Sequence, residues 1–132
     1  MIKFIIFFFL ILASFTGSKS KLELYSQEIG FDASKATLLI SFENCSYCFN
    51  EYQETVKEIN KKIFNVVIIS SQLKKASLFA TLNQQSIFVD REKLAIKMEL
   101  IESLPIILLP NGERIEVFSP NQLSSYAKTY MP

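Results

Sequence analysis

The hydrophobic residues of this chain fall into short runs that are separated by segments with a helical spacing. Residues 36–42 and 65–70 are mostly apolar, and the second run is rich in β-branched residues. Runs of this length without polar alternation are typical of strands buried on both faces of a sheet. Shorter runs at 86–89 and 104–109 predict two further strands, the second of which opens at Pro105.

Between these runs the apolar residues recur every three or four positions, which indicates helices. One stripe consists of Cys48, Tyr52, Val56, Ile59 and Ile63. A second helix is predicted over 72–83, packing through Leu73, Ala76, Phe79, Ala80 and Leu82. A third is predicted over 91–99, with Asp90 as its cap.

The C-terminal part carries two local signals. Asn111-Gly112 predicts a hairpin that leads into a strand over 113–118. Ser119, Pro120 and Gln122 form a capping box that starts the last helix.

Residues 21–35 are ambiguous, with a short edge strand around Leu22, Leu24 and Tyr25 and a loop or single helical turn after it. The order predicts one α/β domain over 21–132, a mixed sheet with helices on both faces.

The N-terminal segment predicts export. Lys3 precedes a continuous apolar run over 4–13, and small and polar residues fill 14–20. This is the layout of a secretory signal peptide, with cleavage expected after Ser18 or Ser20. The run is shorter than the roughly 20 residues of a spanning helix. An uncleaved anchor and a buried core element are the alternatives. We therefore expect an extracytoplasmic protein, periplasmic or secreted, in an oxidising compartment.

Composition narrows the function classes. The chain has 132 residues, of which 49% are hydrophobic and 20% charged, with a net charge of +1. No basic stripe suggests nucleic acid as a partner. The absence of histidine removes the commonest general base and metal ligand. The chain also has only two cysteines, too few for a scaffold of several disulfides.

Those two cysteines form a Cys-x-x-Cys between a buried strand and a helix, which is typical of a redox-active dithiol. Cys45 is expected at the helix N-terminus, where unpaired N–H groups and the helix dipole favour a thiolate, so it is the predicted nucleophile. Cys48, one turn further in, is the predicted resolving thiol. Ser46 and Tyr47 would tune the pair and contact substrate. A passive disulfide, or a zinc site shared between two chains, is the alternative interpretation.

The stretches "LLISFENCSYC" and "SIFVDREKLAIKMELIESLPIILLPNGERI" resemble the thioredoxin-fold superfamily, in particular its TlpA-like or redoxin-type thiol-disulfide oxidoreductases. The resemblance implies a thioredoxin-like three-layer fold. It also implies a cis peptide bond at Pro105, which would turn the Leu104 backbone toward the dithiol to pair with an extended substrate. It suggests that Glu51, if partly buried, accepts the Cys48 proton. A solvated glutamate stabilised by the helix dipole is the alternative.

We therefore expect an exported enzyme, a thiol-disulfide oxidoreductase that acts on protein thiols and disulfides in extended segments, leaning toward reduction. Its Cys45–Cys48 disulfide would need no cofactor and no metal. The expected partners are substrate proteins and a membrane or periplasmic electron donor or acceptor, and the protein itself is expected to be a monomer. The rival interpretation is a non-catalytic thioredoxin-like module that binds peptides beside Pro105. A peroxidase is disfavoured because no Pro-x-x-x-Thr/Ser-x-x-Cys loop precedes the nucleophile.

Overall fold

The computed structural model describes residues 21–43, 45, 47–59, 64–79 and 86–129. Several predictions fall outside this part of the chain. They are the leader over 1–20, the roles of Ser46, Ile63, Ala80 and Leu82, and the end of the predicted helix over 72–83. Within the described ranges, no helix has both the length and the apolar character needed to cross a membrane.

The described strands form one sheet with the order β3-β2-β1-β4-β5. Their bounds are β1 Ala36–Ser41, β2 Phe64–Ile69, β3 Ile87–Asp90, β4 Ile106–Leu108 and β5 Arg114–Glu116. The first three strands are parallel to one another. β4 runs antiparallel to β1, and β5 runs antiparallel to β4. The two central strands β1 and β2 are buried along their whole length, as their continuous apolar runs predict.

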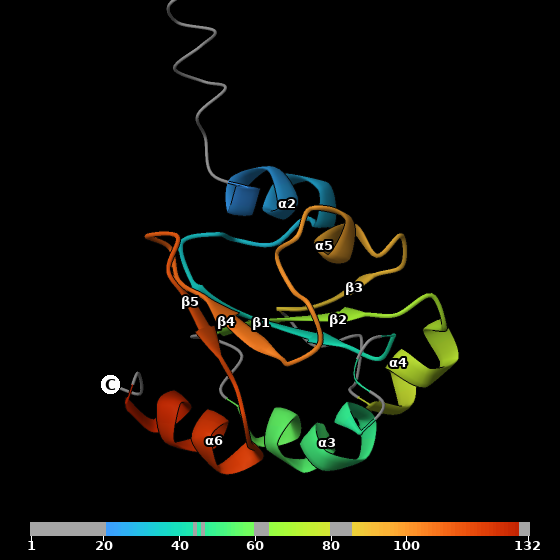
Figure 1. The fold of residues 1–132 in the computed structure, drawn as a ribbon, viewed down its shortest axis with the longest axis vertical. Coiled ribbons are helices and arrows are strands. Elements are labelled where there is room, and N and C mark those ends of the chain that lie inside the picture. Colours follow the sequence, from blue (N-terminus) through green and yellow to red (C-terminus); the bar gives the residue numbers. More distant parts are fainter. Residues whose placement is uncertain (1–20, 44, 46, 60–63, 80–85, 130–132) are drawn as a thin grey trace, which may run out of the picture.

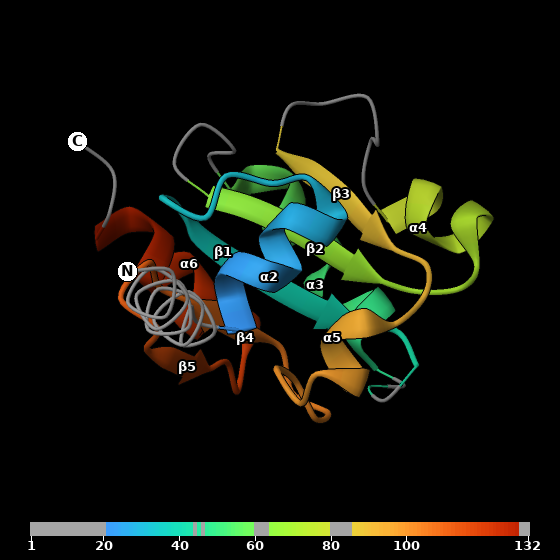
Figure 2. The same cartoon turned by 90° about the horizontal axis from the view of Figure 1, so that it is seen from above.

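Helices lie on both faces of this sheet (Figure 1). Their bounds are α2 Lys21–Ile29, α3 Cys48–Glu58, α4 Leu73–Phe79, α5 Leu94–Lys97 and α6 Pro120–Thr129. The helices α3, α4 and α6 pack on the face that Leu38 and Val66 occupy. Figure 2 shows α2 and α5 over the other face, where Leu39 and Val67 point. The strand order and these three layers confirm the predicted thioredoxin-like α/β fold.

The start of the domain differs from the prediction, because residues 21–29 form the helix α2 and no edge strand. Leu22, Tyr25 and Ser26 are its buried positions, and their spacing of three and four residues is helical. The Tyr25 hydroxyl donates a hydrogen bond of 2.8 Å to the carboxylate of Asp90 at the end of β3. That bond joins α2 to the third strand, a long-range contact that the sequence pattern does not contain.

The helix predicted over 91–99 is shorter than expected. It is reduced to α5, because Lys93 and Glu99 on either side of it have positive φ values of 57° and 59°. Asp90 does cap it, with Oδ1 accepting from the Leu94 N–H and Oδ2 from the Ala95 N–H. The prediction that Leu73 packs inward in α4 is also wrong, since this side chain is 44% exposed.

The structure confirms the predicted turn at Gly112 and the predicted capping box at Ser119. Gly112 adopts a φ of 91° in the turn between β4 and β5, a conformation that glycine accepts at little cost. At the start of α6, Ser119 Oγ accepts from the Gln122 N–H at 3.2 Å. Gln122 Oε1 accepts in return from the N–H of Phe118 at 2.7 Å. The capping box therefore forms, with its return bond one residue earlier than in the standard motif.

Candidate functional site

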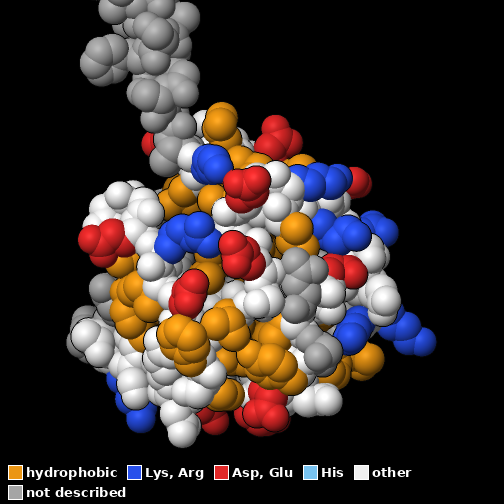
Figure 3. Space-filling view, viewed as in Figure 1, with side chains coloured by type: hydrophobic (Ala, Val, Ile, Leu, Met, Phe, Trp, Pro, Cys, Tyr) orange, Lys and Arg blue, Asp and Glu red, His pale blue; other side chains and the backbone are white. Residues whose placement is uncertain are grey.

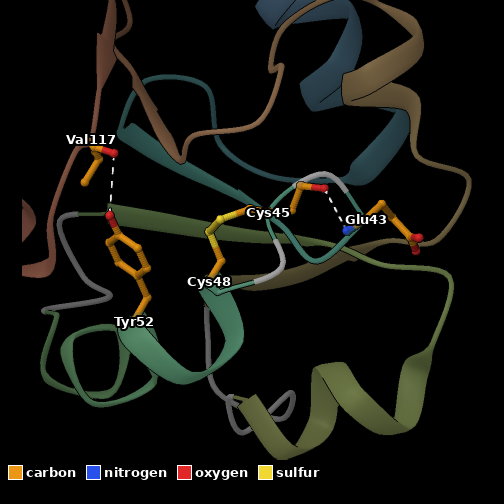
Figure 4. Close-up of a disulfide and its surroundings, with 6 residues drawn as sticks. Glu43, Cys45, Cys48, Tyr52 and Val117 are labelled. Atoms are coloured by element: carbon orange, nitrogen blue, oxygen red, sulfur yellow. Dashed lines mark hydrogen bonds between the residues drawn. A yellow bond between two sulfur atoms is a disulfide. The ribbon is translucent and has the colours of Figure 1, made fainter.

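The two cysteines form a disulfide at the carboxyl end of β1, where the chain crosses to α3 (Figure 4). Their Cα atoms are 5.4 Å apart. Cys48 is completely buried in the core beneath the sheet, and Cys45 keeps 3% of its surface exposed. Both cysteines are therefore buried in the disulfide-bonded protein.

The position of the pair relative to α3 differs from the prediction in one respect. The helix begins at Cys48, so Cys48 is its first residue and does not lie one turn inside it. Cys45 precedes the helix by three residues, and its carbonyl accepts from the Cys48 N–H at 3.3 Å in the turn that leads in. The N-cap residue Tyr47 has a helical conformation and its side chain makes no capping hydrogen bond. The positive end of the helix dipole therefore faces the disulfide without a side-chain cap from Tyr47.

A cluster of aromatic rings supports the start of α3. Phe42, directly after β1, lies 5.4 Å from the Phe49 ring and 4.8 Å from the Phe79 ring of α4, measured between centroids. The Lys75 ammonium sits over Phe42 and Phe49 at 5.6 and 5.4 Å, within the range of a cation–π interaction. These contacts fix α3 against α4, and the sequence did not identify them because they join three separate elements.

Glu43 ties the loop that carries Cys45 to the loop after β2. Its Oε1 accepts from both the N–H and the hydroxyl of Ser71, each at 3.0 Å. Its own N–H donates to the Ser41 hydroxyl at 3.1 Å (Figure 4). The hydrogen bond from the Ser71 N–H is the main reason that the pKa of Glu43 is lowered. Glu43 thus holds the two loops together.

We predict that Glu43→Gln lowers the urea midpoint of unfolding at neutral pH. The pKa of Glu43 is lower in the folded protein than its ordinary value of 4.5. Its contribution is therefore present above that value and is lost as the pH falls through the folded pKa. The midpoints of variant and wild type should converge at a pH well below 4.5. Glu28→Gln, on the exposed side of α2, is the control and should change neither midpoint.

The predicted cis bond at Pro105 is wrong, since no cis peptide bond occurs among the described residues. Pro105 leads into β4 with a trans bond, and its carbonyl accepts from the Val117 N–H at 2.8 Å. This pairing fits a regular antiparallel ladder, and the trans isomer is intrinsically favoured for X–Pro bonds by about 0.5–1 kcal/mol. Because β4 is antiparallel to β1, Leu104 and Pro105 still lie at the end of the sheet where β1 leads to Cys45.

Leu104 lines an open groove on the sheet face that carries α2 and α5. The groove has a volume of about 570 Å³ and is lined by Glu102, Ser103, Leu104, Ile106, Arg114 and Glu116. Neither cysteine borders it. The structure therefore places Leu104 near the dithiol end of the sheet, but its half-buried side chain contributes to a separate, mostly polar surface.

Glu51 lies in the first turn of α3 and is exposed. The role of proton acceptor for Cys48 required partial burial, and this condition is not met. Its place in the first turn fits the alternative interpretation, in which the carboxylate interacts favourably with the helix dipole.

Tyr52, one turn after Cys48, is a residue of the site that the sequence did not identify. Its side chain is completely buried, and its hydroxyl donates to the Val117 carbonyl at 3.5 Å (Figure 4). Burial, followed by the nearby Tyr47 and Glu51, raises the pKa of Tyr52 to about 12, so the phenol is protonated at neutral pH. The helical stripe marked Tyr52 as core, but nothing in the local sequence pairs it with Val117.

Hydrophobic side chains are gathered on one part of the molecular surface. On the face shown in Figure 3, hydrophobic side chains gather in the band between the sheet and the helices α3 and α6. Charged side chains gather above that band, toward α2 and α5. Tyr47 and Phe118, which lie just before α3 and α6, are 45% and 67% exposed. Tyr47 therefore presents its ring to solvent directly before the first residue of α3.

No protein-family model and no curated protein matches this chain. Among solved structures, it is similar to "Solution structure of the reduced form of the N-terminal domain of PilB from N. meningitidis". The sequence identity is 14% and the TM-score 0.41, with 74% of this chain and 82% of that chain covered. A likeness of this size carries no argument about activity. The strand order and layers of the chain itself give it a thioredoxin-like α/β fold, and its Cys-x-x-Cys forms a disulfide.

Proposed function

We propose that this chain is a thiol-disulfide oxidoreductase of the TlpA-like type that acts on protein substrates. The observation that carries the proposal is the Cys45–Cys48 disulfide, which joins the loop after β1 to the first residue of α3. A disulfide that closes so short a loop restricts the unfolded chain little, so its value is chemical more than structural.

The reaction is a pair of exchanges. In the reduced protein, the Cys45 thiolate attacks one sulfur of a substrate disulfide, forming a mixed disulfide and expelling the other substrate sulfur as a thiolate. Cys48 then loses its proton and attacks Cys45 Sγ, which restores the Cys45–Cys48 disulfide and releases the second substrate thiolate. The substrate gains two electrons and the dithiol loses two. The reverse sequence oxidises a substrate dithiol.

The substrate we propose is an extended protein segment with apolar residues next to its cysteine. The exposed ring of Tyr47 and the apolar band beside α3 support this choice. The segment would approach along the end of the sheet, near Leu104 and Pro105. Because Pro105 is trans, the proposed approach of the substrate segment depends on the apolar surface and on the position of Leu104 and Pro105 at the end of the sheet. It does not depend on a cis-proline geometry.

Direction and location are further parts of the proposal. The leader-like sequence over 1–20 supports export to an oxidising compartment, by cleavage or as an anchored form. In that compartment a reductase needs a supply of electrons, so the proposed partner is a membrane or periplasmic thiol donor. The resemblance to TlpA-like proteins is the basis for preferring reduction over oxidation.

The test is a redox titration of the purified domain against reduced and oxidised glutathione, followed by mass spectrometry of alkylated samples. We expect one two-electron transition and faster alkylation of Cys45 than of Cys48. The pH dependence of Cys45 alkylation should give a pKa below the roughly 8.5 of a free cysteine. A pair that never cycles, or a Cys45 with an ordinary pKa, would remove the enzyme hypothesis.

One observation favours a second candidate, a redox-inactive binding module. Both sulfurs are almost entirely buried, Cys45 at 3% and Cys48 at 0% exposure. A structural disulfide would look the same. Replacing both cysteines with serine separates the two hypotheses, because a module would still bind extended peptides and an oxidoreductase would lose all turnover.

A further inference from the structure

The ladder between β4 and β5 has a gap at its end next to the dithiol. Two hydrogen bonds, from the Leu109 N–H to the Glu113 carbonyl and from the Val117 N–H to the Pro105 carbonyl, identify the closely bonded pairs. In an antiparallel ladder such a pair exchanges two N–H···O bonds. Pro105 has no N–H. The Val117 carbonyl therefore loses the ladder partner that any other residue at position 105 would supply.

The missing donor is replaced from α3. The Tyr52 hydroxyl donates to the Val117 carbonyl in a buried environment (Figure 4). A buried carbonyl without a partner is costly, so the proline creates a need, which the Tyr52 hydroxyl meets through a long hydrogen bond of 3.5 Å. Tyr52 lies four residues after Cys48, one helical turn away on the same side of α3. The helix that carries the resolving cysteine is thus fastened to the strand pair that begins at Pro105.

We propose that Tyr52 is a positioning residue for the dithiol, acting through the Val117 carbonyl that Pro105 leaves without a partner. The Tyr52 bond holds the first turn of α3 at a set distance from the sheet. Cys45 is attached to the end of β1 and Cys48 to α3, so this distance governs how readily the two sulfurs meet. Loss of the Tyr52 contact should also slow the resolution of a mixed disulfide. This catalytic consequence rests on the proposed function.

The experiment measures the equilibrium between the Cys45–Cys48 disulfide and glutathione. Tyr52→Phe keeps the ring and removes the donor. We expect its disulfide to be less stable against glutathione than that of the wild type by about three-fold, which corresponds to the loss of one modest hydrogen bond. Tyr25→Phe is the matched control, since it removes another buried tyrosine hydroxyl with a long-range partner, on the opposite face of the sheet. The control should unfold at a lower urea concentration and keep the wild-type equilibrium constant.

A second comparison, in a protein that carries Pro105→Ala, tests whether Tyr52 acts through the Val117 carbonyl. Pro105→Ala supplies an N–H at the pairing position, and the trans bond of Pro105 lets alanine adopt the same backbone. In this background the Tyr52 hydroxyl becomes redundant, so adding Tyr52→Phe should change the disulfide equilibrium by much less than three-fold. If Tyr52→Phe alone does not fold while the double variant does, that rescue supports the same conclusion.

Three results would overturn the proposal. They are an unchanged equilibrium in Tyr52→Phe, an equal shift in Tyr25→Phe, or an undiminished effect of Tyr52→Phe in the Pro105→Ala background. The equilibrium is measured on the disulfide itself, without a protein substrate. A wild type that reduces no substrate would therefore remove the proposed function, while the coupling of Tyr52 to the disulfide would be decided separately.

Discussion

Cys45→Ser is expected to abolish disulfide exchange with protein substrates, whereas Cys48→Ser should still react once. In the proposed mechanism Cys45, in the loop before α3, is the attacking thiol, and Cys48, the first residue of that helix, resolves the mixed disulfide. Without Cys45 no thiolate reaches the substrate. Without Cys48 the mixed disulfide forms and is not resolved, because the second exchange needs the buried thiol.

The measurement combines substrate reduction under steady-state conditions with trapping of the mixed disulfide on a non-reducing gel. Both variants lose the same disulfide, so each controls for the structural effect of that loss on the other. In both variants the steady-state rate of substrate reduction should fall to the rate in buffer without protein. Only Cys48→Ser should accumulate the trapped mixed disulfide. An adduct of equal yield through Cys48 in the Cys45→Ser protein would reverse the assignment of the two thiols.

Asp90→Ala is expected to cause the largest loss of stability among the polar substitutions. Asp90 is completely buried and its carboxylate accepts three hydrogen bonds. The donors are the Tyr25 hydroxyl at 2.8 Å and the N–H groups of Leu94 and Ala95 at 3.0 and 2.9 Å. Removing the carboxylate leaves three donors without it, two of them at the start of α5. We expect a loss of about 3 kcal/mol or more in the free energy of unfolding.

Urea denaturation measures this loss, and Asp32→Ala is its control. Asp32 is exposed, and among the described residues its side chain accepts from the N–H and hydroxyl of Ser34 in a local turn. Its replacement should cost less than about 1 kcal/mol. Hydrogen exchange adds a structural readout, because α2 and α5 should lose protection in Asp90→Ala before the central strands do. Equal unfolding midpoints for the two variants would show that the Asp90 contacts do not hold α2 to the sheet.

The sequence predicted the parts of the fold whose signals are local. Continuous apolar runs predicted β1 and β2, because a strand covered on both faces has no polar side to display. The turn at Gly112 and the capping box at Ser119 were also predicted, since each depends on residues within a few positions. The strand interpretation of residues 21–29 was wrong because Leu22 and Leu24 fit an alternating pattern, whereas the buried positions Leu22, Tyr25 and Ser26 follow the helical spacing.

The sequence by itself determined that two cysteines stand between a buried strand and a helix, which is the basis of the proposed thiol-disulfide chemistry. Tertiary structure decided what surrounds them. The register of β4 and β5 sets Val117 opposite Pro105, and the packing of α3 brings the Tyr52 hydroxyl to that carbonyl. Likewise Tyr25 meets Asp90 across 65 positions. Such pairs form only when whole elements pack together. The spacing of residues along the chain does not predict which residues of distant elements come into contact.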